Sequence, residues 1–284
     1  MTFGTAFYLL KQEMTPRYGE QEAAAIAHEV MEDITKLSKI DRLMLKDQAL
    51  NTVQENELDF ILDELLNGKP LQYVLGKCWF MGREFRVNEQ VLIPRPETEE
   101  LVIWILNELQ QNQAGKSLLD IGTGSGCIPV SLKTELAEVK IEACDISEGA
   151  LELAQENALK AGTEVFFFHQ DILDAQLWPD LKEYDVMVSN PPYIPASEAI
   201  TMEQHVTAFE PHQALFVPDQ DPLIFYKAVA ALGRLKLKAG GAVFCEIHRD
   251  FPEATKTVFA EAGYTHIELR KDMHDNWRMI KAML

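Results

Sequence analysis

The fold is decided by the stretch LLDIGTGSG at residues 118–126. Its apolar first half predicts a buried strand, and its glycine-rich second half predicts a turn where a ligand can approach the backbone closely. The pattern that follows is helical, with Pro129 in the first turn, so the first N–H groups of this helix point back at the turn. A strand, a glycine turn and a helix in this order begin an open α/β sheet.

Strand-like and helical segments alternate downstream of this stretch, which predicts a mostly parallel sheet with helices on both faces. The closing segment, residues 264–284, has two apolar stretches that predict an antiparallel pair. The parallel strands are expected at residues 117–121, 139–145, 165–170, 184–189 and 241–247.

The first 75 or so residues are predicted to form a small bundle of four or five helices. Thr15-Pro16 has the pattern of a helix start, and residues 20–34 and 56–66 carry apolar side chains at helical spacing. Residues 78–93 change to a β pattern and predict a hairpin. We therefore divide the chain into a helical bundle at 1–76, a hairpin linker at 77–93 and a catalytic domain at 94–284.

Composition restricts the classes of partner. The 284 residues carry a net charge of −19, and 47% are hydrophobic, which favours a globular protein with a substantial core. Nucleic-acid phosphates require clustered Lys and Arg, so direct binding to DNA or RNA is disfavoured. We expect a cytoplasmic monomer with no disulfide, metal site, signal peptide or membrane span. The four cysteines are at 78, 127, 144 and 245, with no C-x-x-C pair.

Three acidic strand ends favour a nucleoside ligand. Asp145 ends the next strand about twenty residues after the glycine turn, where a carboxylate can bind both ribose hydroxyls. Asp171 can accept the exocyclic amine of an adenine, whose face Ile172 would cover. The G-x-G-x-G spacing is tighter than the dinucleotide fingerprint and favours S-adenosylmethionine, with Asp120 near its ammonium. A ligand-free turn and a nicotinamide cofactor are the alternatives.

A second motif, Asn190-Pro191-Pro192-Tyr193, follows the strand at residues 184–189. The prolines end the strand and stiffen the turn. The Asn190 side-chain oxygen and the Pro191 carbonyl are acceptors beside the Tyr193 ring, an arrangement that suits a planar –NH2 group. The motif therefore indicates chemistry on an amide or nucleobase nitrogen; a purely structural turn is the alternative.

Together these residues resemble the HemK/PrmC family, the glutamine N5-methyltransferases that modify class-I peptide chain release factors. The resemblance covers nearly the whole chain, and PRPETE at 94–99 combined with NPPY at 190–193 is its most specific part. The other matching segments are residues 70–76, 91–93, 120–126, 145–147, 189–194, 209–211 and 214–215.

The resemblance implies a class I, Rossmann-like methyltransferase domain with a seven-stranded sheet, and a glutamine from a Gly-Gly-Gln loop as the substrate. It implies substrate binding by Asn190, Pro191, Pro192 and Tyr193, with Asn190, Pro191 and Tyr193 catalytic. The expected cofactor-binding residues are Asp120, Gly122, Thr123, Gly124, Ser125, Gly126, Asp145, Asp171, Ile172 and Asn190.

The sequence departs from the family pattern at two places, and both concern the substrate side. The family has Glu-Ile-Gly where this chain has EIHRD at 246–250, so the departure is at His248–Asp250; the second departing segment is HDNWR at 274–278. Adenine N6-methyltransferases share the NPPY turn, so an enzyme that acts on nucleic acid is the alternative function. The strongly negative net charge argues against it. A binding module for translation factors that keeps the cofactor only for stability is a further alternative.

Overall fold

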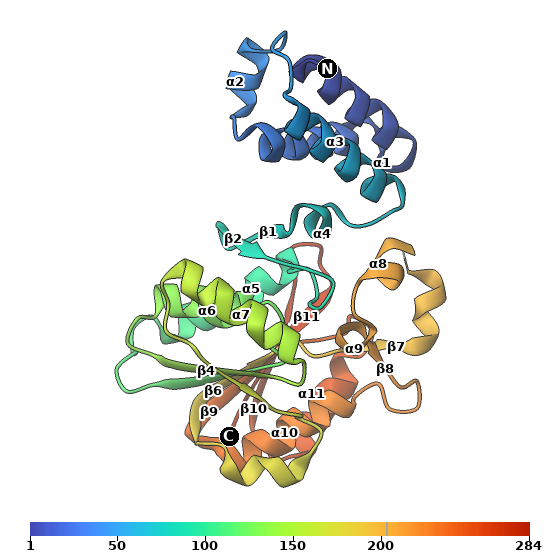
Figure 1. The fold of residues 1–284 in the computed structure, drawn as a ribbon. Helices are drawn as coiled ribbons and strands as arrows, with labels where there is room; N and C mark the ends of the chain where they lie inside the picture. Colours follow the sequence, from blue (N-terminus) through green and yellow to red (C-terminus); the bar gives the residue numbers. More distant parts are fainter. Residues whose placement is uncertain (203) are drawn as a thin grey trace. The chain divides into compact units, whose positions relative to one another are not determined.

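The computed structural model describes residues 1–202 and 204–284, which form two compact units (Figure 1). The first unit is Met1–Gly76 together with Gln204–Phe209, and the second is the rest of the described chain from Lys77 onward. Each unit has its own hydrophobic core.

The first unit is helical, as predicted, with α1 at Phe3–Thr35, α2 at Lys39–Met44, α3 at Thr52–Leu66 and α4 at Leu71–Leu75. Its core is formed mainly by α1 and α3. Short α8, Gln204–Phe209, also belongs to this unit. The predicted helix start at Thr15-Pro16 is wrong. Thr15 Oγ1 donates to the Lys11 carbonyl 2.6 Å away inside α1, and the helix is interrupted instead at Gly19, which adopts a φ of 76°.

A hairpin begins the second unit. Strands β1 (Lys77–Phe80) and β2 (Arg83–Arg86) pair antiparallel, and Phe80 and Phe85 are buried in one of the cores of this unit. The hairpin is shorter than predicted, because residues 87–93 are not assigned to a strand. They form a loop with a turn, in which the Val91 N–H donates to the Asn88 carbonyl at 3.1 Å, and the loop leads into α5, Pro96–Leu109.

A seven-stranded sheet in the order β10-β11-β9-β6-β3-β4-β5 forms the centre of the second unit and confirms the predicted fold class. Five strands are parallel and β11 is antiparallel to both of its neighbours, as the apolar pattern of the closing segment predicts. The strands are β3 Ser117–Ile121, β4 Lys140–Asp145, β5 Phe166–His169, β6 Tyr184–Ser189, β9 Leu237–Glu246, β10 His266–Lys271 and β11 Trp277–Met283.

Helices cover both faces of the sheet and bury two separate cores. One core includes side chains of α5 and α6 (Cys127–Glu135), with α7 (Glu148–Ala161) beside them. The other includes α10 (Ile224–Lys236) and α11 (Pro252–Glu261). The remaining elements are η1 Ala175–Asp180, β7 Ile194–Pro195, η2 Ala196–Thr201, α9 His212–Leu215 and β8 Phe216–Val217.

The order of the strands locates the ligand site. Strand β3 is flanked by β4, the next strand along the chain, and by β6, which the chain reaches only after β5. The strand order therefore reverses at β3. Open α/β sheets bind ligands outside the carboxyl ends of their strands at such a reversal. The glycine turn follows β3, Asp145 ends β4, and Asn190 follows β6.

Candidate active site

The turn after β3 is held in an open conformation by its glycines. Gly122, Gly124 and Gly126 have φ angles of 74°, 53° and 77°, which L side chains rarely adopt. The N–H groups of Gly122 and Thr123 donate to the Cys144 carbonyl at 2.9 and 3.0 Å, which fixes the turn against the end of β4. A Cβ at Gly122 or Gly124 would meet no atom within 4 Å, so these two glycines border open space.

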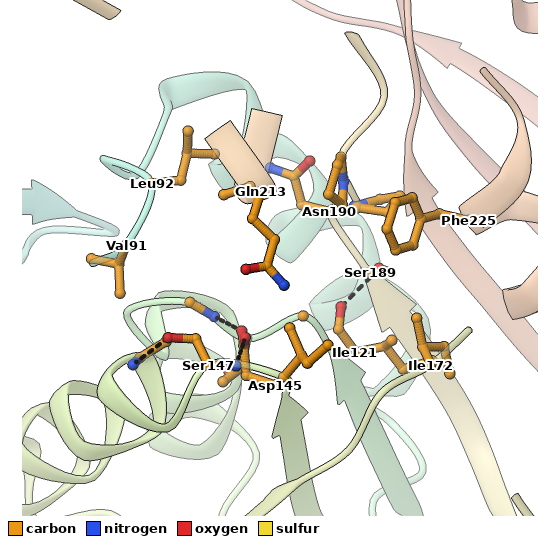
Figure 2. A pocket seen from close by; sticks show the side chains of 18 of the residues that line it. Val91, Leu92, Ile121, Asp145, Ser147, Ile172, Ser189, Asn190, Gln213 and Phe225 are labelled. Atoms are coloured by element: carbon orange, nitrogen blue, oxygen red, sulfur yellow. Dashed lines mark hydrogen bonds between the residues drawn. The ribbon is translucent and has the colours of Figure 1, made fainter. Parts of the chain in front are cut away.

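Asp145 lies at the end of β4 and connects two parts of the site. Its carboxylate accepts from the N–H of Gly124 and from the N–H of Ser147, both at 2.9 Å (Figure 2). Burial raises the pKa of Asp145, although the N–H donors of Ser147, Gly124 and Ile146 partly oppose the shift. Each oxygen keeps a free lone pair, so the carboxylate can still accept hydrogen bonds from a diol.

Asp120 lies in β3 just before the turn and is completely buried. Neither of its carboxylate oxygens has a hydrogen-bond partner among the described residues. Burial raises the pKa of Asp120 to about 7, and the nearby Asp145 carboxylate adds to the shift. A buried carboxylate without a partner is costly unless a cation or donor compensates it. This position therefore favours a positively charged ligand.

The strand ends open into a cavity of about 550 Å³, within the range of small-molecule and cofactor sites. Figure 2 shows Ile121, Asp145 and Ile172 on the strand side, with Val91 and Leu92 opposite them. Apolar side chains make up much of the wall, so a flat apolar ring fits between them.

The Asn-Pro-Pro-Tyr turn borders the same cavity. Ser189, the last residue of β6, donates from Oγ to the Ile121 carbonyl at 2.8 Å and holds the turn beside the glycine loop (Figure 2). Asn190, Pro191 and Pro192 line the cavity. Tyr193 is not part of the lining; its hydroxyl turns away and donates to Glu246 Oε1 at 2.8 Å.

Most of the site residues predicted from the sequence lie together around the cavity. Those that line the cavity are Gly122, Thr123, Gly124, Ser125, Asp145, Asp171, Ile172, Asn190, Pro191 and Pro192. Asp120, Gly126 and Tyr193 lie outside the lining. Asp120 precedes the turn, and Gly126 ends it and packs against α7, where an added Cβ would meet that of Ala154 at 3.0 Å.

Several lining residues were not predicted as site residues. Thr98 lies in the first turn of α5 and accepts a hydrogen bond from Asn190 Nδ2 at 3.2 Å. The Gln213 carboxamide, from α9, points into the cavity between its two sides (Figure 2). Phe225 lies beyond the Asn190 turn (Figure 2). The PRPETE segment was a sequence signal for Thr98, but Gln213 and Phe225 come from segments whose pattern does not distinguish them from ordinary helix residues.

An ion pair with a buried carboxylate connects two segments that border the cavity. Arg95 Nη2 bonds to Glu210 Oε1, and the side chain of Glu210 is completely buried. The other oxygen of Glu210 accepts from the Ile93 N–H at 3.3 Å. Nearby, Glu99 accepts from the Met81 N–H at 2.6 Å and ties the hairpin turn to α5. The PRPETE segment is therefore held at both ends.

Comparison with known proteins identifies the family. Residues 12–76 match the PrmC N-terminal domain model, and residues 103–209 match the methyltransferase small domain model. The release factor glutamine methyltransferase of Bacteroides thetaiotaomicron is 39% identical over 96% of this chain and 97% of its own length. That of Flavobacterium psychrophilum is 37% identical over 95% of both chains. The chain belongs to the release factor glutamine methyltransferase family.

A solved structure supports the fold of this family member. The methyltransferase from Pyrococcus furiosus is 15% identical, with a TM-score of 0.52 over 72% of this chain and 90% of its own. At this identity the likeness concerns the fold alone. In the described part of the chain, no helix has the length and apolarity to cross a bilayer, and no group of three or more His, Cys, Asp or Glu side chains is placed to hold a metal.

As a methyltransferase of this family, the protein uses S-adenosylmethionine as its methyl donor. The residues present fit this cofactor. Asp120 is an uncompensated buried carboxylate suited to a cation, Asp145 can accept from a ribose diol, and the glycine turn leaves open space for close approach. Asp171 and Ile172 also line the cavity, and their contact with an adenine stays a prediction.

Proposed function

We propose that this protein methylates the N5 side-chain nitrogen of the glutamine in the Gly-Gly-Gln loop of class-I peptide chain release factors. The observation that carries the proposal is the shared cavity, in which Asn190 and Pro191 lie beside the glycine turn. A substrate carboxamide bound by Asn190 and Pro191 would face the place where the glycine turn and Asp145 would hold the cofactor. The two relatives that match nearly the full length of this chain are named release factor glutamine methyltransferases.

Asn190 and Pro191 would orient the substrate nitrogen. The Asn190 Oδ1 atom and the Pro191 carbonyl accept the two amide hydrogens, so the nitrogen is fixed with its lone-pair face toward the methyl donor. The amide nitrogen is a weak nucleophile, because its lone pair is delocalised into the carbonyl. Correct placement can supply about 7–11 kcal/mol of the barrier reduction. Position is therefore the main contribution of the protein.

The same two acceptors stabilise charge in the transition state. Bound S-adenosylmethionine supplies an electrophilic methyl carbon on a sulfonium sulfur. As the N–C bond forms and the C–S bond breaks, positive charge develops on the substrate nitrogen, and oxygen acceptors aimed at it gain strength. The nitrogen then loses one hydrogen as a proton, either to water or through Asn190. Tyr193 does not line the cavity, so we assign it no direct contact with the substrate.

The partner follows from the same proposal. We propose that the protein acts as a monomer on the folded release factor and binds no nucleic acid directly. The net charge of −19 supports the absence of direct nucleic-acid binding, because it opposes contact with phosphate backbones. It also favours a substrate protein with a basic surface around its glutamine loop.

Mass spectrometry of a release factor incubated with the protein and S-adenosylmethionine tests the proposal. The glutamine of the Gly-Gly-Gln loop is expected to gain one methyl group, and a release factor with that glutamine replaced by Asn is expected to gain none. Parallel incubations with DNA and RNA test the alternative function. Methylated adenine with an unmodified release factor would overturn the proposal.

A further inference from the structure

A buried network beside the cavity contacts Asn190 through Thr98, which itself lines the cavity. Asn190 Nδ2 donates to Thr98 Oγ1 at 3.2 Å, and Thr98 Oγ1 donates to Glu246 Oε2 at 2.7 Å. The second oxygen of Glu246 accepts from the Tyr193 hydroxyl at 2.8 Å. Thr98 and Glu246 are each only 2% exposed. These side chains come from α5, the end of β9 and the turn after β6.

We propose that Thr98 and Glu246 are positioning residues that set which way the Asn190 carboxamide faces, and that methyl transfer depends on this orientation. The inference rests on the proposed function, because it assigns a role to the residues behind its central side chain. It also gives a function to Tyr193, whose hydroxyl completes the network.

The direction of each hydrogen bond follows from the available hydrogens. A threonine hydroxyl has one hydrogen, and Thr98 gives it to Glu246. Its oxygen can then only accept from Asn190. The Asn190 Nδ2 must therefore face Thr98, which leaves Oδ1 as the group available to a substrate. The reversed amide would place Asn190 Oδ1 against Thr98 Oγ1, with no hydrogen between the two oxygens. It would also present the Asn190 –NH2 hydrogens to a substrate –NH2, which has no acceptor for them.

Glu246 determines this polarity because its carboxylate offers acceptors to both neighbours. Tyr193 must be a donor to match it, and burial raises the pKa of Tyr193 well above its usual value, so the hydroxyl keeps its proton. Burial also raises the pKa of Glu246, which the two donated hydrogen bonds and the Arg278 guanidinium oppose. The network therefore offsets part of the cost of burying this carboxylate.

A salt bridge holds the far end of the network in place. Arg278, near the start of β11, has Nη1 3.5 Å from the Tyr193 hydroxyl, and its Nε bonds to Asp272 Oδ2 at 3.1 Å. The Asp272 side chain is completely buried. Glu246 directly precedes the Ile247-His248 step, where the sequence departs from the family pattern, and Arg278 ends the second departing segment, residues 274–278.

Two substitutions that keep the shape test the proposal. Thr98→Val removes the hydroxyl, and Glu246→Gln allows the side-chain amide to donate, so that Thr98 can donate to Asn190 Oδ1 and the reversed orientation becomes possible. Both are expected to lower kcat for release factor methylation by about 10- to 100-fold, the effect of losing one or two hydrogen bonds in a buried site. The Kd for S-adenosylmethionine, from isothermal titration, is expected to stay within about threefold.

Thr98→Ser and Thr255→Val are the matched controls. Thr98→Ser keeps the hydroxyl and is expected to restore kcat to within about threefold of the wild type. Thr255, in α11, is as buried as Thr98, but its hydroxyl has no hydrogen-bond partner within residues 1–202 and 204–284. Thr255→Val therefore removes a buried threonine hydroxyl without touching the network, and it is expected to leave kcat unchanged.

A measurement that needs no activity separates this inference from the proposed function. In ¹⁵N-labelled protein the Asn190 side-chain hydrogens are expected to exchange slowly in the wild type and Thr98→Ser, and quickly in Thr98→Val. If the wild type fails to methylate a release factor but this exchange pattern holds, the proposed function is wrong and the orientation stands. Unchanged exchange in Thr98→Val, or unchanged kcat in both Thr98→Val and Glu246→Gln, would overturn the inference.

Discussion

Three polar side chains at the strand ends have different surroundings and therefore different roles. Asp145 is supported by backbone N–H donors, Asp120 is buried with no hydrogen-bond partner in the described part of the chain, and Asn190 donates to Thr98. An acceptor that already has donors can bind neutral hydroxyls, whereas an uncompensated carboxylate requires a cation. Asp145 and Asp120 therefore suit cofactor binding, whereas Asn190 suits orientation of the substrate.

The charge state of Asp120 makes cofactor binding depend on pH. Its pKa is raised to about 7, so below that pH the carboxyl is largely protonated and must release a proton to bind a cation. We expect the affinity for S-adenosylmethionine to rise with pH, by up to about tenfold per unit below the pKa, and to level off above it. Isothermal titration from about pH 6 to 8 measures this. Asp120→Asn should bind more weakly and lose this rise; an identical pH profile in the variant would refute the assignment.

Asn190→Ala is expected to reduce methyl transfer by at least about 100-fold, because it removes an acceptor aimed at developing charge. Its Kd for the cofactor should stay within about tenfold of the wild type, since the turn and Asp145 remain. Single-turnover rates and isothermal titration measure the two effects. Normal turnover in this variant would contradict the role of Asn190.

Asp145→Ala is expected to weaken cofactor binding, which Asn190→Ala leaves nearly unchanged. Its loss removes acceptors for the ribose and leaves the N–H groups of Gly124 and Ser147 without their partner. Affinity for S-adenosylmethionine should fall by about 10- to 100-fold, the scale of a charged hydrogen bond. Isothermal titration is the measurement, and wild-type affinity would show that Asp145 does not bind the cofactor.

At the scale of elements, the glycine turn is the part of the site that tolerates the least change. Gly126→Ala places a side chain at a φ of 77° and 3.0 Å from the Cβ of Ala154 in α7. We expect it to lower the free energy of unfolding by about 1–3 kcal/mol and to weaken cofactor binding.

Gly162→Ala provides the control for backbone strain. Gly162 ends α7 at a φ of 66°, and an added Cβ there would meet no atom within 4 Å. It should lower stability in thermal unfolding while leaving cofactor affinity near that of the wild type. If both variants bound the cofactor equally well, the close packing of the turn against α7 would not matter for the site.

The strands were predictable from the sequence because their burial follows a simple pattern. The predicted ranges at residues 117–121 and 184–189 coincide with β3 and β6, and the closing pair appears as β10 and β11. The helix start predicted at Thr15-Pro16 was wrong, because these two residues are tolerated inside α1, while Gly19 supplies the break. The Thr98–Glu246 contact joins residues 148 positions apart, and local pattern carries no information about such a pairing.

At the scale of the whole molecule, the second unit contains every residue that lines the cavity. It also contains the whole hydrogen-bond network that joins Asn190, Thr98, Glu246 and Tyr193. A fragment of residues 77–284 is therefore expected to fold and to bind S-adenosylmethionine with a Kd within about threefold of the full chain. Circular dichroism and isothermal titration measure this. An unfolded fragment, or one with more than about tenfold weaker binding, would show that the cofactor site depends on the helical unit.

A crystal structure of the protein with S-adenosylhomocysteine and a peptide that contains the Gly-Gly-Gln sequence tests the proposed mechanism most directly. We predict that the glutamine nitrogen lies within hydrogen-bond distance of Asn190 Oδ1 and the Pro191 carbonyl, facing the sulfur of the bound nucleoside. A glutamine bound elsewhere, or packed protein between the Asn190 corner and the nucleoside, would contradict the mechanism.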